Sequence, residues 1–373
     1  SGSMPSRGRA RLSSVSSPPE AVQPCWEASR TLLKEQSADI RGDSGQGYCS
    51  NVWVITRWNR VRSMVEPQAV ASRYADRRLL WKAAIKWPMY SVAVMPVLLA
   101  AGWRIGAVGS LRWTQLFGFL LAAILLLLWE NLSNDLFDAD TGVDTTGKPH
   151  SVVNLTGRRD RVALASLASL GSGLLLMAWL AWCSSVLVLA LVLLCCGLGY
   201  VYQGPPFRLG YRGLGEPLCW LAFGPCATAA ALLVLEPQGA NAIPWGTAWM
   251  LGAGPAVATS LVLFCSHFHQ VSEDSAHGKR SPVVRLGTAR AAALIPWLVA
   301  LTLALEWLPM LQGDWPLTVL LSGLGLPAGL ALIRLMQRCH DQPDRISGSK
   351  FLALRFQAWN GLGLALGLAL GRL

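Results

Sequence analysis

Charged residues are scarce in this sequence. Asp, Glu, Lys and Arg make up 14% of its 373 residues and hydrophobic residues make up 53%, whereas a soluble domain carries about 25% charged residues. This composition is typical of a protein that spans a membrane. The formal net charge is +11, but the basic residues lie in short connections between apolar runs, where they set topology and meet anionic lipid or substrate. Nucleic-acid binding is therefore not expected.

The sequence also lacks the cysteine and histidine spacings of zinc sites. Its nine cysteines include no CxxC pair, and six of them lie in apolar segments between residues 183 and 265. A cysteine in such a segment acts as a small buried hydrophobe. His267 and His269 have no partner at zinc spacing. A zinc centre is therefore not expected, and the cysteines do not indicate a redox compartment.

A long apolar run is absent from residues 1–65. This segment is rich in serine and arginine and modest in acidic residues, which is typical of an organellar transit peptide and not of a secretory signal. A disordered tail has the same composition, so that alternative stays open. Residues 66–87 follow, in which basic residues alternate with Leu80, Trp81 and Ile85. This alternation predicts an amphipathic helix lying on the membrane surface.

Residues 88–373 consist of apolar runs separated by short polar connections. About nine runs approach the roughly 20 residues that a helix needs to cross hydrocarbon. The predicted spans are 88–103, 113–129, 162–182, 186–201, 214–235, 246–265, 291–308, 317–335 and 351–370. The sequence therefore predicts an all-α membrane protein with one transmembrane domain over residues 88–373.

Within residues 88–373, most of the lysine and arginine lies in or next to the connections after the even-numbered runs. The odd-numbered connections hold only Arg104 and Arg112. By the positive-inside rule, the even-numbered connections and the N-terminus share one side of the membrane, which is the stromal side in a plastid. All candidate catalytic residues fall in or next to these connections, so they are expected to meet on that side.

The second run ends in a polar stretch, ENLSNDLFDADTGVD, at residues 130–144. Asn131, Asn134, Asp135 and Asp138 project from nearly one face if the helix continues through them. Carboxylates at the edge of a bilayer indicate a functional site, and carboxylate and amide oxygens are the hard ligands that suit Mg²⁺. A solvated helix end with capping residues is the plain alternative, but capping does not require four aspartates.

The sixth run ends in a second polar segment at residues 267–288. It holds His267, Gln270, Glu273, Asp274, Lys279 and Arg280. His267, Gln270 and Asp274 would share one face of a helix, because the second and third lie three and seven residues after the first. Carboxylates for a metal beside cations for free phosphate oxygens are what a metal-bridged diphosphate needs. The two polar segments together therefore predict a diphosphate site.

Two further connections on the same side supply candidate substrate contacts. The loop after the second run holds Lys148 and Arg158, and the segment 200–216 holds Tyr202, Arg208 and Arg212. The prolines and glycines of the second loop predict a rigid turn. Its side chains are candidates to contact a phosphate or an aromatic acceptor, and a purely structural turn with interfacial tyrosines is an equally open interpretation.

At these residues the chain resembles the UbiA superfamily of intramembrane aromatic prenyltransferases, in its MenA type. Asn134, Asp135 and Asp138 match the family's Asn-Asp-x-x-Asp motif at the end of the second span. Asp274 matches the later aspartate of the Asp-x-x-x-Asp motif after the sixth span, which places Gln270 where the family has its earlier aspartate. Four stretches carry the resemblance: NLSNDLFDADTGVD, HSVVNLTGRR, PPFRLGYRGLGEPL and HFHQVSEDSAHGKRSPVVRLGT.

The resemblance implies a nine-helix bundle that transfers a phytyl group from phytyl diphosphate to 1,4-dihydroxy-2-naphthoate or 2-carboxy-1,4-naphthoquinone, with decarboxylation, in phylloquinone synthesis. It implies a multi-pass protein of a chloroplast membrane, either the inner envelope or the thylakoid. The implied Mg²⁺ ligands are Asn134, Asp135, Asp138, Glu273 and Asp274. The implied catalytic residues are Asp135, Asp138, Asp274, Lys279 and Arg280. The implied substrate contacts are Asn131, Asn134, Lys148, Arg158, Tyr202, Arg208, Arg212, His267 and Gln270.

Two alternative functions remain compatible with the sequence. A related prenyltransferase would use another aromatic acceptor, such as homogentisate or 4-hydroxybenzoate, and the pocket residues that decide this cannot be assigned from sequence. A multispanning transporter would use acidic helix ends for a coupling ion, but it would place charges near the membrane midplane on broken helices. Here the carboxylates lie at helix ends on one side, beside basic residues, which favours the enzyme.

Overall fold

The computed structural model describes residues 79–81, 84–141, 151–236 and 241–371. These lie in a compact unit that runs from Arg73 to Leu373. The predicted transit peptide, most of the predicted surface helix and Lys148 fall outside the described residues. Residues 79–81 and 84–85, within the predicted surface helix, are helical.

Every regular element in these described ranges is a helix. The long helices are α3 (Tyr90–Val108), α4 (Trp113–Thr141), α7 (Arg159–Trp182), α8 (Val186–Gln203), α11 (Trp245–His267), α14 (Thr288–Leu311), α15 (Leu326–Cys339) and α16 (Ser349–Leu370). The shorter helices are η2 (Trp87–Met89), α6 (Val152–Thr156), η3 (Leu209–Arg212), α9 (Gly215–Leu221), η4 (Ala222–Cys226), α10 (Ala227–Leu235), α12 (Val271–Ala276), α13 (Pro282–Leu286) and η5 (Leu317–Gly325). The all-α prediction is confirmed.

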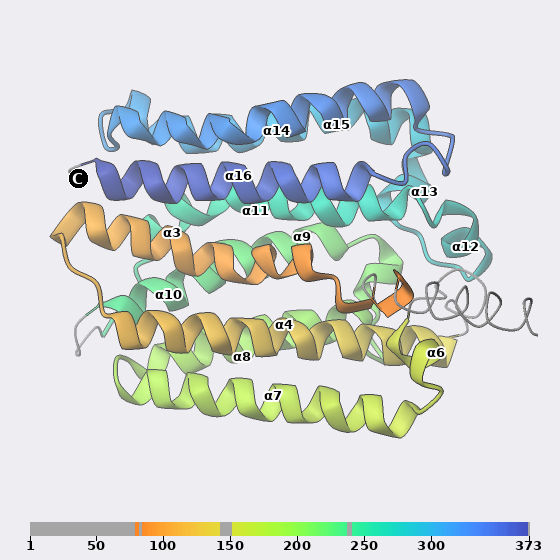
Figure 1. Cartoon of the computed structure of the whole chain (residues 1–373), viewed down its shortest axis with the longest axis horizontal. Helices are drawn as coiled ribbons and strands as arrows, with labels where there is room; N and C mark the ends of the chain where they lie inside the picture. Colours follow the sequence, from red (N-terminus) through yellow and green to blue (C-terminus); the bar gives the residue numbers. More distant parts are fainter. Residues whose placement is uncertain (1–78, 82–83, 142–150, 237–240, 372–373) are drawn as a thin grey trace, which may run out of the picture. The chain divides into compact units, whose positions relative to one another are not determined.

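The long helices run side by side in one bundle (Figure 1). Helices α14 and α15 form one edge in this view and α7 forms the other, with α16, α11, α3, α4 and α8 between them. The short helices α6, α12 and α13 gather at one end. Connections after the second, fourth and sixth predicted spans therefore meet at that end, as the charge pattern predicts.

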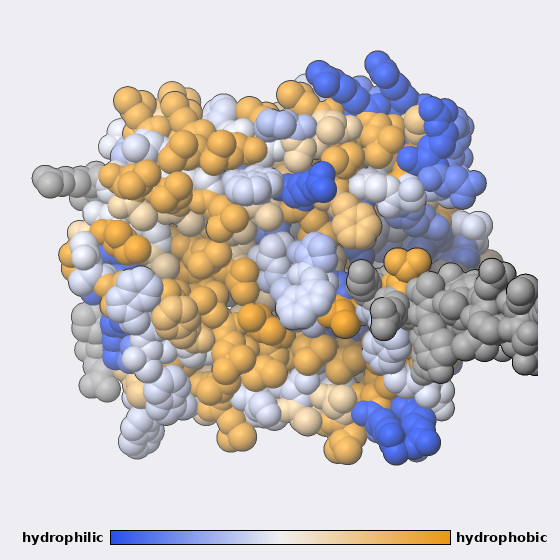
Figure 2. All heavy atoms as spheres, viewed as in Figure 1, coloured by the Kyte–Doolittle hydropathy of each residue, from blue (hydrophilic) through white to orange (hydrophobic). Residues whose placement is uncertain are grey.

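Large apolar side chains cover much of the outside of the bundle, among them Leu175, Trp297 and Leu311, which are exposed. Figure 2 shows an apolar surface across the middle of one face, with hydrophilic residues gathered near the end where α12 and α13 lie. A surface that exposes this much hydrocarbon is suited to lipid and not to water. The distribution fits a bundle that crosses the membrane along its helices.

Eight membrane-crossing segments satisfy length and composition among the described residues, whereas the sequence predicts about nine. The ninth predicted run is α16, a 22-residue helix that packs against α3, α11, α15 and η5. It is not among the eight segments, and it carries Lys350, Arg355, Gln357 and Asn360. The count of nine is therefore not confirmed, although a ninth long helix occupies the predicted place.

The fifth predicted span is broken in the middle. Helix α9 passes into a π-helical turn at residues 222–226, where Gly224 leaves helical geometry with φ −101° and ψ −110°. Pro225 lacks an amide hydrogen and disfavours helical geometry at the residue before it. A Cβ at Gly224 would lie 2.6 Å from that of Ala256 in α11. The break therefore lets this span pack closely on α11, and it places the preceding turn beside the cavity described next.

Candidate active site

A cavity of about 430 Å³ lies inside the bundle. Its wall is formed by side chains of α3, α4, α7, α8, α9, η4, α10 and α11, by residues just before α3 and just after α11, and by Lys279 and Lys350 from the segments around α12 and α16. One end is polar and is lined by Lys86, Asp135, Asp138, His267, Lys279 and Lys350. The other end is apolar and is lined by Phe119, Ala123, Leu126, Leu127, Met177 and Val192.

Helix α4 presents the first predicted cluster to this cavity. The helix continues to Thr141, so Asn131, Asn134, Asp135 and Asp138 share a face, and all four line the cavity wall. The carboxyl groups are deeply placed: Asp135 is 4% exposed and Asp138 is 2% exposed. Sequence spacing therefore brings these four residues together as predicted, while their roles stay predictions.

Asp135 is held by two partners from other segments. One Oδ accepts a hydrogen bond of 3.0 Å from the backbone amide of Val152, at the start of α6. The other Oδ lies 3.5 Å from the ammonium nitrogen of Lys86, a residue just before η2 whose backbone is left-handed, with φ +52°. Lys86 was not among the predicted site residues, because only the folded chain brings the residues before the first span to the end of the second.

Asp138 is held from the opposite wall. The side-chain amide of Gln203, the last residue of α8, donates a hydrogen bond to an Oδ of Asp138. Gln203 is 6% exposed and lines the cavity together with its neighbour Tyr202. The sequence offers a weak signal for it, since it is a polar residue at the end of an otherwise apolar run, next to a predicted site residue.

The second predicted cluster does not lie on one helix. Helix α11 ends at His267, and Gln270 precedes the short helix α12. The chain turns between them, so the helix face that the spacing predicts is absent. His267, Gln270 and Lys279 nevertheless line the cavity, whereas Glu273 and Asp274 are not part of its wall.

Asp274 is fully buried beneath the cavity and contacts two of the wall residues. Its carboxylate oxygens lie 3.3 Å from the ammonium of Lys279 and 3.5 Å from Nδ1 of His267. The other ring nitrogen of His267 lies 3.5 Å from a carboxylate oxygen of Glu216. Burial alone would raise the pKa of Asp274, but His267 and the charge of Lys279 outweigh burial and lower that pKa. Asp274 therefore stays ionised and fixes both groups.

The remaining predicted cations that the structure describes lie outside the cavity wall. Arg158 and Arg280 are exposed, and the side chain of Arg208 lies over the ring of Tyr211, 5.9 Å from its centroid. The carbonyl of Arg212 accepts a 2.5 Å hydrogen bond from Arg285. The hydrogen bond from Arg285 attaches the η3 loop to α13, whereas the contact between Arg208 and Tyr211 lies within the loop. Tyr202 of the same segment lines the cavity, and the roles of Arg208 and Arg212 as substrate contacts stay predictions.

Lys350 and His269 also line the cavity, although the sequence did not single them out as site residues. His269 Nε2 lies 3.0 Å from the hydroxyl of Ser349. Burial, followed by the positive charge of Lys350, lowers the pKa of His269. His269 follows α11 and Lys350 lies at the start of α16. These positions are far apart in the sequence, so no local pattern could connect them.

Comparisons with known proteins cover most of the part of the chain that forms this cavity. A model of the UbiA prenyltransferase family matches residues 93–360. The chain is 41% identical over 302 residues to the 2-carboxy-1,4-naphthoquinone phytyltransferase of Synechocystis sp., covering 81% of this chain and 96% of that protein. It is 40% identical over 302 residues to the chloroplastic enzyme of the same name in Arabidopsis thaliana. That alignment covers 79% of this chain and 78% of the Arabidopsis protein.

A solved structure of digeranylgeranylglyceryl phosphate synthase shares the fold. It aligns with a TM-score of 0.52 at 13% identity and covers 79% of this chain and 99% of that one. The family match contains both polar helix ends and most of the cavity wall. The resemblance carried by the sequence motifs is therefore confirmed, and the chain belongs to the UbiA prenyltransferase family.

Proposed function

We propose that the chain transfers a phytyl group from phytyl diphosphate to 1,4-dihydroxy-2-naphthoate, or to its oxidised form 2-carboxy-1,4-naphthoquinone, releasing CO₂ and diphosphate. The observation that carries this function is the division of one cavity into a polar end with carboxylates and lysines and an apolar end. A prenyl diphosphate has the same two halves. Relatives that share about 40% of the sequence are named as phytyltransferases of that acceptor.

Three lysines would bind the diphosphate. Lys86, Lys279 and Lys350 all reach the polar end of the cavity from different segments. Ammonium groups placed where negative charge grows on a leaving group stabilise that charge in the transition state. Lys279 is held in place by the buried carboxylate of Asp274, which lies 3.3 Å from its nitrogen. Asp274 in this way acts as a positioning residue.

The oxygen atoms of α4 fit a Mg²⁺ ion. Asn134, Asp135 and Asp138 line one side of the cavity, and each bonded carboxylate oxygen retains a lone pair for a metal. No group of three or more His, Cys, Asp or Glu side chains within the described residues is arranged to hold a metal, so oxygens of the diphosphate would complete the coordination. When bound, the ion would supply charge neutralisation that assists departure of the diphosphate.

The apolar end would hold the phytyl tail and exclude water. Side chains such as Leu126, Met177 and Val192 offer hydrocarbon contact and no nucleophile. The bond between the phytyl carbon and the diphosphate oxygen breaks with its electron pair leaving on the diphosphate. The ring carbon that bears the carboxylate then forms the new bond, and loss of CO₂ returns the electron pair to the ring. An excluded water molecule cannot capture the allylic cation.

The test is an assay of the purified protein in membranes with Mg²⁺. Phytyl and geranylgeranyl diphosphates are offered with dihydroxynaphthoate, homogentisate and 4-hydroxybenzoate, and products are identified by mass. The expected product is the decarboxylated phytyl naphthoquinol. Prenylation of homogentisate or 4-hydroxybenzoate alone would show that the proposed acceptor is wrong. Uptake of substrate without any covalent product would show that the protein is a transporter and not an enzyme.

We propose further that the protein is a multi-pass protein of a chloroplast membrane, in the inner envelope or the thylakoid. The basis is the apolar helical bundle together with the chloroplastic relative from Arabidopsis thaliana. The predicted transit peptide at residues 1–65 lies outside the described residues and stays a prediction. Import of the labelled full chain into isolated chloroplasts, followed by mass analysis of the mature N-terminus, tests both statements.

A further inference from the structure

One carboxyl group in the cavity has no role in the site described so far. Glu130 lines the wall on α4, one helical turn before Asn134 and one after Leu126. At 1.5 Å per residue it lies about 6 Å from Asn134 and about 12 Å from Asp138 along the helix axis, towards the apolar end. It therefore marks the boundary between the two halves of the cavity.

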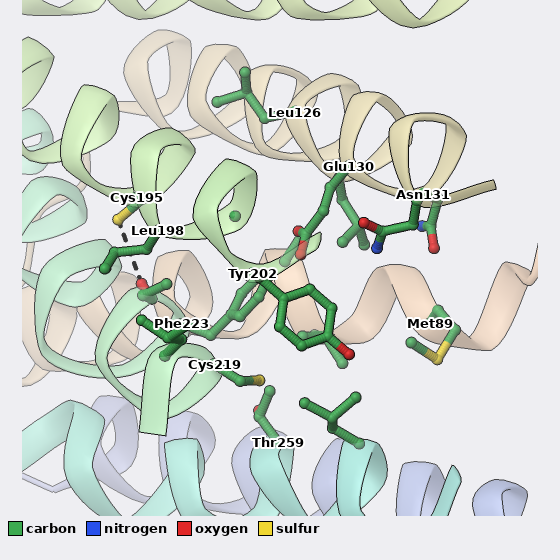
Figure 3. Close-up of a pocket in the computed structure, with 18 of the residues that line it drawn as sticks. Met89, Leu126, Glu130, Asn131, Cys195, Leu198, Tyr202, Cys219, Phe223 and Thr259 are labelled. Atoms are coloured by element: carbon green, nitrogen blue, oxygen red, sulfur yellow. Dashed lines mark hydrogen bonds between the residues drawn. The ribbon is translucent and has the colours of Figure 1, made fainter. Parts of the chain in front are cut away.

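Glu130 points across the cavity towards Tyr202, with Cys219 and Thr259 beyond (Figure 3). Its carboxyl group packs beside Gly199 of α8, where a Cβ would lie 3.7 Å from the carboxyl carbon, an ordinary van der Waals distance. Within the described ranges Glu130 has neither a hydrogen-bond donor nor an ion-pair partner. By contrast, Asp135 and Glu306 are both hydrogen-bonded.

A carboxylate without a donor is costly in an apolar cavity, so a ligand that supplies a donor gains affinity there. Phytyl diphosphate supplies none, because its tail is hydrocarbon and its diphosphate is an anion. A dihydroxylated aromatic acceptor supplies two hydroxyl groups. The unsatisfied group therefore matches the acceptor and not the prenyl donor.

The height of Glu130 in the cavity agrees with this match. If the diphosphate is bound beside Asp135 and Asp138, the reacting carbon of the phytyl group lies next to it on the apolar side. The ring that attacks this carbon must then stand at the level of Glu130 and Tyr202. A ring hydroxyl directed at Glu130 would orient the ring in contact with the reacting carbon.

We infer that Glu130 binds a ring hydroxyl of the aromatic acceptor and thereby selects the reduced, dihydroxylated acceptor over its quinone form. The inference rests on the proposed function. A hydrogen bond from a hydroxyl to a carboxylate also increases the electron density of the ring, which favours attack on an allylic cation. At the same two ring positions a quinone presents carbonyl oxygens, which donate no hydrogen bond and meet repulsion from a carboxylate.

The test combines Glu130→Gln with methyl ethers of the acceptor. In Glu130→Gln, KM for dihydroxynaphthoate is expected to rise about 10- to 100-fold, because a charged hydrogen bond is lost, while KM for phytyl diphosphate stays within twofold. In the wild type, methylation of one hydroxyl is expected to cause a similar rise. In Glu130→Gln, the same methyl ether should raise the acceptor KM only slightly. Such non-additivity is the signature of a direct interaction between the carboxylate and the hydroxyl.

Two further measurements separate the outcomes. Glu306→Gln is the matched control, because Glu306 is a buried carboxyl group that does not line the cavity; an equal rise in acceptor KM there would overturn the inference. Hydrolysis of phytyl diphosphate in the absence of acceptor is measured in Glu130→Gln as well. If this hydrolysis falls as much as acceptor binding does, Glu130 acts on the cation, and the inference is overturned. The wild-type ether series decides the question even if Glu130→Gln does not fold. Absence of any transfer by the wild type would instead contradict the proposed function.

Discussion

At the scale of single residues, the carboxylates of Asp135, Asp138 and Asp274 are held in place by neighbours from distant parts of the chain. Val152 and Lys86 hold Asp135, Gln203 holds Asp138, and Lys279 contacts Asp274. Each partner fixes a rotamer without consuming all lone pairs of the carboxylate. These contacts therefore fix in advance the side chains that are proposed to bind a cation and a diphosphate.

Asp138→Asn is expected to reduce phytyl transfer by about 100-fold or more, since it removes a charge that a metal-bound diphosphate requires. The matched control is Asp140→Asn. Asp140 pairs with Arg159 at 2.7 Å and does not line the cavity, so its loss should leave kcat within a few-fold. Turnover in membranes, with thermal unfolding in detergent as the folding check, measures both. Near-normal turnover of Asp138→Asn would remove the residue from the site.

Asp274→Ala is expected to be more damaging than Gln270→Ala. The first change leaves Lys279 buried without its partner, which costs about 3 kcal/mol or more in stability, whereas Gln270 is a partly exposed residue of the cavity wall. Unfolding temperature and kcat should both fall further in Asp274→Ala. The reverse order would mean that the glutamine, and not the buried aspartate, supports the chemistry.

At the scale of elements, helix ends and breaks decide which side chains meet. Apolar runs of nearly membrane-spanning length predicted the long helices, and the continuous α4 explains why its four polar residues were placed together correctly. The break between His267 and Gln270 was missed, because a helical spacing is compatible with a turn followed by a new helix. Lys86, Lys350 and Glu216 could not be predicted, because their contacts join segments far apart in the sequence.

Gly224→Ala is expected to lower the free energy of unfolding by about 1–3 kcal/mol through overpacking against α11, since a Cβ there lies 2.6 Å from Ala256. Gly171→Ala is the matched control. A Cβ at Gly171, within α7, meets nothing within 4 Å, so the change should be neutral or slightly stabilising. Thermal unfolding in detergent compares them, and an equal loss in both would contradict the close contact.

At the scale of the whole molecule, the short helices of the basic connections share one end of the bundle (Figure 1), and residues of that end, such as Asp138 and Lys279, line the polar part of the cavity. The sequence predicted this grouping from loop charge alone, because charge asymmetry reflects how a chain inserts and does not require knowledge of tertiary contacts. The internal cavity could not be predicted in the same way. It arises from the way the helices pack, which composition does not encode.

Membrane topology can be measured with single cysteines introduced into a chain whose native cysteines are replaced. Ser347→Cys lies in the connection before α16 and Gln312→Cys lies after α14, both at exposed positions. A membrane-impermeant maleimide is expected to label the two from opposite sides, with Ser347→Cys on the stromal side. Labelling of both from one side would contradict the orientation.

The charges around the cavity balance one another. Among the described residues that line it, three carboxylates (Glu130, Asp135 and Asp138) face three ammonium groups (Lys86, Lys279 and Lys350). A divalent cation alone or a trianionic diphosphate alone would upset this neutrality, whereas the two together change it by a single charge. Binding of each should therefore strengthen binding of the other, and by thermodynamic reciprocity the coupling factor is identical in both directions.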